Sequence, residues 1–141
     1  LIPSRTSRLG PVALRHPAYW RLEPSLPGAL PRSHLLLDPL GAALAVEEDR
    51  QGASPEAVLA LAAPGETSLG ERILPEPLDR AGRFVGREST LRVEGRHFGR
   101  DVWVARVPSG PLVVVELQFP WEARAAYRHL ARKMLAEATW R

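Results

Sequence analysis

Hydrophobic positions in the last third of the chain follow the period of strands first and of a helix afterwards. Residues 90–94 and 101–107 alternate between two faces, with the period of two that is typical of a strand. Residues 112–119 are almost continuously apolar, which predicts a central strand covered on both faces. Residues 121–140 follow a proline and repeat apolar side chains at helical spacing, which predicts a long C-terminal helix with one side on the sheet.

The middle of the chain predicts a hairpin and an edge strand. Residues 34–37 form a short apolar run that ends in a turn signal at Asp38-Pro39, and residues 42–48 then alternate. Residues 71–83 contain two prolines. They predict an edge strand with a loop, because proline lacks the N–H that an interior strand would donate.

A short helix is predicted between these segments. Residues 54–56 read Ser-Pro-Glu, which is typical of a helix start: serine can cap free N–H groups, proline suits the first helical position and glutamate favours the positive end of the dipole. Apolar side chains follow at helical spacing until Pro64-Gly65 ends them. A helix of about two to three turns depends on packing for its stability.

The first 32 residues contain six prolines, which exclude a long helix and an interior strand there. Residues 12–14 and 19–22 could pair only at an edge. We expect a flexible, Pro- and Arg-rich segment over residues 1–18, and then an arm that Tyr19 and Trp20 lay over the rest of the chain.

These elements together predict an α+β fold. It is a twisted antiparallel sheet of about five to seven strands, rich in meander connections, with the short helix and the long C-terminal helix packed on it. A length of 141 residues fits one domain, which we place at residues 19–141. The central position of residues 112–119 implies that Val114→Asp unfolds the chain, because burying an unpaired carboxylate costs several kcal/mol.

Composition and charge exclude several classes of site. The chain has no cysteine, which excludes disulfides, thiolate zinc sites, iron–sulfur clusters and cysteine nucleophiles within it. No stretch approaches the roughly 18 apolar residues of a membrane-spanning helix. The net charge is only +3 and Lys133 is the single lysine, so the high isoelectric point reflects arginine chemistry and does not indicate a nucleic-acid binder. The bias towards Arg, Ala, Leu, Pro and Gly suggests a high-GC bacterial genome, even a thermophile.

We find no catalytic or metal-binding constellation and expect no cofactor. The histidines are His16, His34, His97 and His129. None has a histidine at i+4 or the Cys/His spacing of a zinc site. Ser33 and His34 with Asp38 could suggest a triad, but neighbours on a strand point to opposite faces. Residues 47–49 are acidic without the spaced ligands and glycine of a calcium loop, so we interpret them as a solvated strand end.

Two similar glycine-bounded segments, residues 82–86 and 95–99, are interpreted as hairpin loops, since neither has the pattern of a phosphate-binding loop. Arg96, His97 and Arg100 in or beside the second loop could contact an anionic partner.

The C-terminal helix offers a second candidate surface. Arg124, Arg128 and Arg132 lie four residues apart and could bind nucleic acid or anionic lipid; the alternative is the wet face of an amphipathic helix. Trp103 alternates with valines and could line a ligand pocket, and the alternative is packing in the core. Trp121 and Trp140 bracket the predicted helix, and we expect them to clamp its ends.

Glu116 interrupts the most apolar strand. A buried carboxyl can have a raised pKa that suits acid–base chemistry. We expect instead a structural ion pair with an arginine of the neighbouring strand, with Arg106 as the leading candidate.

The order of elements resembles the PsbP-like fold. The resemblance rests on a tryptophan in Trp20–Glu23, an apolar run into Asp-Pro in Leu35–Pro39, the alternating residues 42–48, the helix start Ser54–Glu56 and the terminal helix around Tyr127–Leu135. That fold is shared by the extrinsic PsbP subunit of photosystem II, a Ran-binding nuclear import factor and many bacterial envelope proteins. It implies a non-enzymatic accessory or binding protein, often exported, and transfers no functional residue to this chain.

From these observations we expect a non-catalytic binding or accessory protein of the bacterial cell envelope, with an unidentified protein or small ligand as partner. The alternative is a cytoplasmic binder of nucleic acid or another anionic partner, which would use the arginines of the C-terminal helix; a small hydrolase comes third. We favour an exported, periplasmic location, and a cleaved leader is one explanation for a chain that begins with Leu1.

Overall fold

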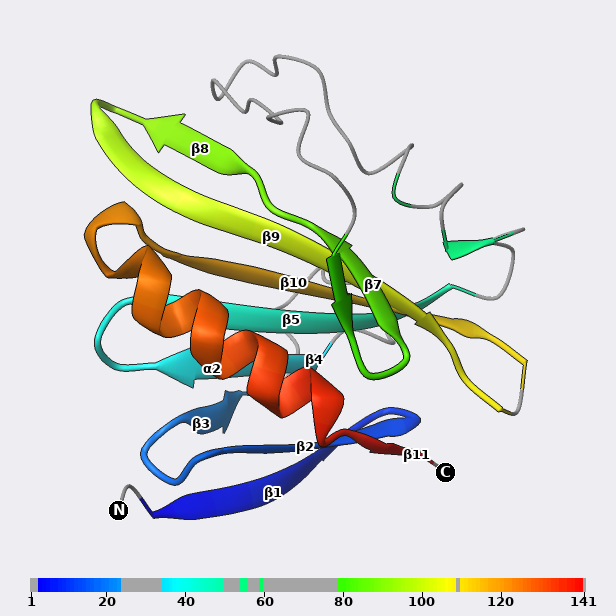
Figure 1. Cartoon of the computed structure of the whole chain (residues 1–141). Coiled ribbons are helices and arrows are strands. Elements are labelled where there is room, and N and C mark those ends of the chain that lie inside the picture. Colours follow the sequence, from blue (N-terminus) through cyan, green and yellow to red (C-terminus); the bar gives the residue numbers. More distant parts are fainter. Residues whose placement is uncertain are drawn as a thin grey trace.

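The computed structural model describes residues 3–23, 34–49, 54–55, 59, 79–108 and 110–140. A sheet of eight strands forms its centre (Figure 1). The strands are β3 (Arg21–Glu23), β4 (His34–Asp38), β5 (Ala42–Asp49), β6 (Asp79–Ala81), β7 (Phe84–Arg87), β8 (Thr90–Val93), β9 (Arg96–Arg106) and β10 (Leu112–Pro120). All of their pairings are antiparallel, which confirms the predicted α+β class with eight strands in this sheet instead of five to seven.

The strand order is β3-β4-β5-β10-β9-β7-β6, and β8 also pairs with β9. Residues 112–119 therefore lie in the middle of the sheet, between β5 and β9, as predicted. The predicted hairpin of β4 and β5 is confirmed, with Leu36 opposite Leu44. The edge strand predicted within residues 71–83 is present as β6, while residues 71–78 lie outside the described part of the chain.

Both faces of the central strand are covered at its first half. Val113 and Val115 belong to the main core cluster, which α2 (Arg124–Ala136) joins with Tyr127 and Met134. Leu112 belongs to a second cluster on the opposite face, together with Leu59. Most of the predicted short helix at residues 54–62 lies outside the described residues; Pro55 and Leu59, which are described, are helical, and Leu59 is buried.

The helix α2 follows a 3-10 turn, η1 (Trp121–Ala123), and lies across one face of the sheet (Figure 1). Its buried residues are Tyr127, Ala131, Met134 and Leu135, the spacing that places one stripe of a helix on a core. The helix ends at Ala136, earlier than predicted, and Thr139–Trp140 forms strand β11. Trp140 therefore stacks on Phe84, with ring centroids 5.4 Å apart, and does not clamp the helix end.

The first 18 residues differ most from the prediction of a flexible segment. Strands β1 (Ser4–Leu9) and β2 (Val12–Pro17) form an antiparallel hairpin, and β11 extends it to a three-stranded sheet. The prolines fall before the hairpin, in its turn and at its end, where no ladder N–H is needed. Gly10 has a φ of 65°, which suits the first central position of a tight hairpin turn. Leu9, Val12 and Leu14 are fully buried, so the hairpin is part of the main core.

The two similar glycine-bounded segments have similar structures. Gly82 and Gly95 each lie in a hairpin turn with positive φ, as predicted. Gly86 and Gly99 instead lie within strands, opposite Trp103 and Phe119. A Cβ on either would lie 2.2 Å from the facing ring, because each ring covers the glycine of the neighbouring strand.

Candidate functional site

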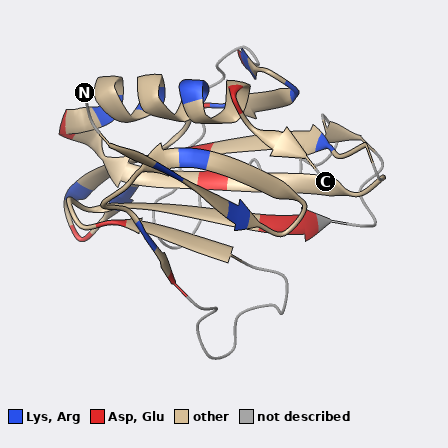
Figure 2. Cartoon of the chain, turned by 90° about the horizontal axis from the view of Figure 1, so that it is seen from below, with Lys and Arg blue, Asp and Glu red and all other residues tan. Residues whose placement is uncertain are grey.

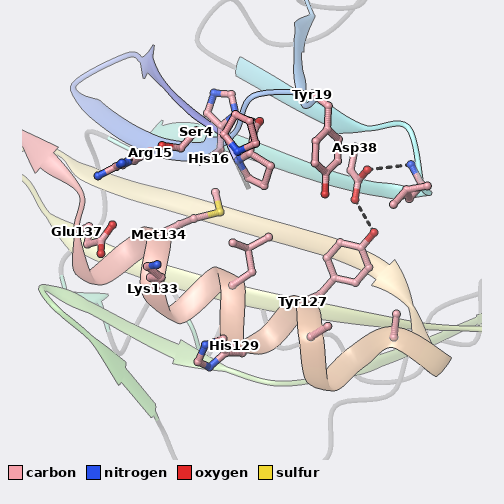
Figure 3. Close-up of a pocket in the computed structure, with 16 residues that line it drawn as sticks. Ser4, Arg15, His16, Tyr19, Asp38, Tyr127, His129, Lys133, Met134 and Glu137 are labelled. Atoms are coloured by element: carbon pink, nitrogen blue, oxygen red, sulfur yellow. Dashed lines mark hydrogen bonds between the residues drawn. The ribbon is translucent and has the colours of Figure 1, made fainter. Parts of the chain in front are cut away.

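The main candidate site is a groove between α2, the β1–β2 hairpin and the turn that joins β4 to β5. We call it the α2 groove (Figure 3). Its volume is about 730 Å³, within the range of pockets that hold small ligands. None of the residues singled out from the sequence as candidate binders lines it.

The wall of the α2 groove is largely apolar. The helix contributes Ala126, Leu130 and Met134. On the opposite side lie Tyr19 and Leu40, which are 45% and 72% exposed. Two large side chains exposed at one opening are the kind of surface that a ligand or partner covers.

A buried acidic group lies at one end of the groove. The Asp38 carboxylate is 4% exposed and accepts hydrogen bonds from the Tyr127 hydroxyl at 2.5 Å and from the Leu40 N–H at 2.8 Å. The Asp38-Pro39 turn, recognised in the sequence, thus caps its own backbone through Asp38. The side chains of Tyr19 and Tyr127 both lie beside Asp38 (Figure 3).

Burial raises the pKa of the Tyr127 hydroxyl, and the hydrogen bond to Asp38 and its negative charge raise it further. The hydroxyl therefore remains a proton donor at neutral pH and holds α2 against the β4–β5 turn.

The other end of the groove carries Arg15, Lys133 and Glu137 (Figure 3). His16 lies beside them on β2, and its two ring nitrogens hydrogen-bond to the Ser7 hydroxyl at 2.7 Å and the Pro17 carbonyl at 2.8 Å. The imidazole is thereby oriented by the hairpin itself.

The arginine stripe of α2 consists of Arg124, Arg128 and Arg132. These three side chains lie in two different environments. Arg128 binds the fully buried carboxylate of Asp101 through two hydrogen bonds of 3.0 Å, and it also lies 3.5 Å from Glu88. Arg132 binds Asp79 at 2.6 Å and also Glu88. Basic and acidic segments are accordingly interspersed over the helix and the strands (Figure 2). Two of the three arginines of the stripe thus hold α2 to the sheet.

The carboxylates of this network have opposite pKa shifts. Burial raises the pKa of Asp101, although the hydrogen bonds and charge of Arg128 oppose it. Partial burial also acts to raise the pKa of Asp79, but hydrogen bonds from Arg132 and from the Arg80 N–H, with the Arg132 charge, lower it overall.

Arg124, at the N-terminal end of α2, lies instead near His97, and both side chains contact Trp121. The His97 ring stacks on Trp121 with centroids 4.2 Å apart, and the Arg124 guanidinium lies 4.4 Å from the same indole. Arg96 lies over the neighbouring Phe98 ring at 5.2 Å. The structure thus brings three of the predicted binding residues to one end of the molecule, and Trp121 does pack at the start of the helix as expected.

Arg100 and Trp103, two further residues predicted to bind a partner, instead contact other residues of the sheet. Arg100 forms the ion pair with Glu116, and the predicted partner Arg106 does not; Arg106 donates to the Gly110 carbonyl at 2.8 Å. The register explains the difference, since Glu116 lies opposite Val102, two residues from Arg100 and four from Arg106. Trp103 is buried in the main core and lines no part of the α2 groove.

Sequence reasoning did not identify the α2 groove, because its residues come from segments that are distant along the chain. Asp38 was recognised only as a turn residue and Tyr127 only as part of the apolar helix face. Their 89-residue separation leaves no local signal of the hydrogen bond between them. The exposed aromatic Tyr19 in a proline-rich segment was the one available indication.

Among the described residues, no group of three or more His, Asp or Glu side chains could hold a metal ion. In the same part of the chain, no helix is both long and apolar enough to span a membrane.

The sequence matches no family model and no curated protein. Solved structures do match. Mog1p, a Ran-binding protein of Saccharomyces cerevisiae, superposes with a TM-score of 0.66 at 13% identity over 99% of this chain and 96% of that one. LpqN, involved in cell envelope biogenesis of Mycobacterium tuberculosis, gives 0.59 at 16% identity over 98% and 90%.

A protein of Bacteroides thetaiotaomicron gives a TM-score of 0.60 at 15% identity over 95% of this chain and 47% of that one. This chain therefore spans about half the length of the Bacteroides protein. At these identities the likeness concerns the fold alone. The chain shares its fold with Mog1p and LpqN.

Proposed function

We propose that this chain is a non-catalytic binding module that holds the apolar part of a small ligand in the α2 groove. The observation that carries this proposal is the groove itself, with a volume of about 730 Å³ between α2 and the β1–β2 hairpin and a wall that includes Leu130 and Met134. A preformed apolar concavity with a few placed polar groups is the usual form of a ligand site. The exposure of Tyr19 and Leu40 at its opening supports the same function.

Two observations support a role without catalysis. The Tyr127 hydroxyl has a raised pKa and donates to Asp38, so it is not a base at neutral pH. His16, which lines the groove, has both ring nitrogens in hydrogen bonds to the hairpin. Covalent catalysis requires a nucleophile in contact with an activating base. The hydroxyl that His16 contacts is that of Ser7, and Ser7 is not among the residues that line the groove.

We further propose a place in the PsbP-like fold family and in the bacterial cell envelope. The fold likeness to LpqN, whose role is in cell envelope biogenesis, supports this, and the likeness to Mog1p supports binding as the shared kind of function. Fractionation of the cells that encode the chain tests the location: recovery in the cytosolic fraction would contradict it.

The alternative, an anionic-partner binder that uses the arginine stripe, has less support. Arg128 and Arg132 already bind carboxylates of the sheet, and a phosphate would have to displace them. Only Arg124, at the start of the stripe, lies apart from this network.

Filling the groove tests the proposed function. Ala126 and Ala125 are neighbouring exposed alanines of α2, and of the two only Ala126 lines the groove. We expect Ala126→Trp to weaken binding of the neutral fluorescent probe N-phenyl-1-naphthylamine at least tenfold, because the indole occupies the ligand's space. Ala125→Trp is the matched control and should change binding less than twofold.

The location of the probe can be read from a single signal. The chain contains one methionine, Met134, and it lines the groove. Labelling the methionine methyl with ¹³C therefore gives one resonance, which should shift when the probe binds. Probe binding that leaves this resonance unmoved, or that Ala126→Trp and Ala125→Trp reduce alike, would contradict the proposal.

A further inference from the structure

Among the described residues, none balances the charge of Asp38 by an ion pair. Its carboxylate is buried, and its two hydrogen-bond donors, the Tyr127 hydroxyl and the Leu40 N–H, are both neutral. Within the described ranges, no arginine, lysine or histidine forms an ion pair with it. The other buried carboxylate described, that of Asp101, has Arg128 as its counter-charge.

An ionised carboxylate that leaves water without a counter-ion costs several kcal/mol. A carboxylate has about four acceptor positions, and Asp38 uses two of them. Arg15 and Lys133 cannot balance the charge closely, because they line the opposite end of the groove (Figure 3). A ligand could supply the positive charge and donate hydrogen bonds to the remaining acceptor positions of Asp38.

The surroundings of Asp38 suit a cation. Tyr19 and Tyr127 both lie beside Asp38 (Figure 3), and aromatic rings attract ammonium and guanidinium groups. The apolar side chains Leu130 and Met134 extend from Tyr127 along the same helix. A positive group at Asp38 would thus leave the rest of a ligand against an apolar wall.

We propose that the α2 groove selects a small cationic amphiphile, with an ammonium group bound at Asp38 and an alkyl body along Leu130 and Met134. This inference rests on the proposed binding function and names its ligand class. The ammonium donates hydrogen bonds to the free acceptor positions of the carboxylate, and the charge-assisted bonds replace those that Asp38 lost with its water.

Three ligands with the same alkyl chain test the inference: octylammonium, octan-1-ol and octanoate, titrated at neutral pH while the Met134 methyl resonance is followed. We expect octylammonium to bind at least tenfold more tightly than octanol, and octanoate to bind most weakly, because its charge repels Asp38. This comparison uses the unmodified chain and does not depend on whether any variant folds.

Asp38→Asn identifies the group responsible. Asparagine has the same shape but no charge: its oxygen can accept from the Leu40 N–H, and its amide NH2 can donate to the Tyr127 hydroxyl oxygen. We expect it to bind octylammonium and octanol with similar affinity. Glu122→Gln removes an exposed carboxylate outside the groove and should preserve the tenfold preference.

Equal binding of octanol and octylammonium to the unmodified chain, or an unchanged preference in a folded Asp38→Asn variant, would overturn the inference on charge. The proposed binding function would still stand if the Met134 resonance shifted with the neutral ligand. Absence of any shift with all three ligands, and with the naphthylamine probe, would overturn both.

Discussion

His97 lies against the indole of Trp121 in surroundings that disfavour its protonated form. Partial burial lowers the pKa of His97, the charges of Arg92 and Arg124 lower it further, and Glu122 opposes them. The unfolded chain therefore binds a proton at His97 more readily than the folded chain. The contribution of this residue to stability is full above the unfolded pKa of about 6.5 and is lost as the pH falls below it.

We expect Arg124→Gln to raise the pKa of His97 and Glu122→Gln to lower it, because the two substitutions remove opposite charges near the ring. An NMR titration of the imidazole signals measures both shifts. Arg8→Gln is the control, since Arg8 lies on β1 in the other sheet and its loss should leave the pKa unchanged. Shifts of the same sign in both test variants would contradict this electrostatic account.

At the level of elements, β10 shows how one strand can serve two cores. Val115 is 1% exposed in the main cluster, whereas Val114 faces the second, smaller cluster and is only partly buried. Glu116 follows on the same face as Val114, where Arg100 reaches it from β9. The two faces therefore differ in how much charge they tolerate.

We expect Val115→Asp to unfold the chain, at a cost of about 4 kcal/mol or more, because a lone carboxylate would enter the main core. Val114→Asp, which the sequence alone predicted to be equally severe, should cost less, since that side chain retains access to water. Urea unfolding followed by circular dichroism measures both. Equal destabilisation by the two substitutions would contradict this prediction, because it would mean that both faces of β10 are equally shielded from water.

At the scale of the whole molecule, α2 is bound to strands in both halves of the sheet order, by ion pairs in one half and by a hydrogen bond in the other. Arg128 reaches Asp101 on β9, and Arg132 reaches Asp79 on the edge strand β6. On the opposite flank of the helix, the Tyr127 hydroxyl donates to Asp38 at the end of β4. The helix is thus bound to the sheet on both of its flanks.

Removal of Arg128 should destabilise the chain through the charge it leaves behind. Arg128→Met leaves Asp101 buried and unpaired, at a cost of about 3 kcal/mol, and Asp101→Asn in the same chain should recover part of this loss. The folded pKa of Asp101, already raised by burial, rises further without Arg128. Protonation then relieves the cost, so the deficit of Arg128→Met relative to the unmodified chain should shrink from pH 7 to pH 4.

Chemical denaturation at the two pH values measures this deficit. Comparison with the unmodified chain at each pH cancels the titration of the other carboxylates. A deficit that stays constant or grows towards pH 4 would mean that Asp101 is not the group that Arg128 neutralises.

The sequence by itself determined the elements whose signal is local. The alternation in residues 90–94 and 101–107 and the helical spacing of α2 each reflect a face that must leave water, and the apolar run at 112–119 reflects two such faces; these elements are present. The β4–β5 hairpin was recognisable from its turn signal at Asp38-Pro39 in the same way. A central strand was recognisable because only a strand covered on both sides can be apolar at almost every position.

Tertiary structure decided the rest, because the deciding contacts join residues that are far apart in sequence. The N-terminal hairpin pairs with β11 and packs into the main core, contacts that no local pattern indicates, so its prolines alone favoured a flexible segment. Arg128 and Arg132 have the same spacing as a solvated stripe and bind the sheet only because Asp101 and Asp79 lie opposite them. The α2 groove exists where the hairpin, the β4–β5 turn and the helix meet, and no single segment carries a pattern for it.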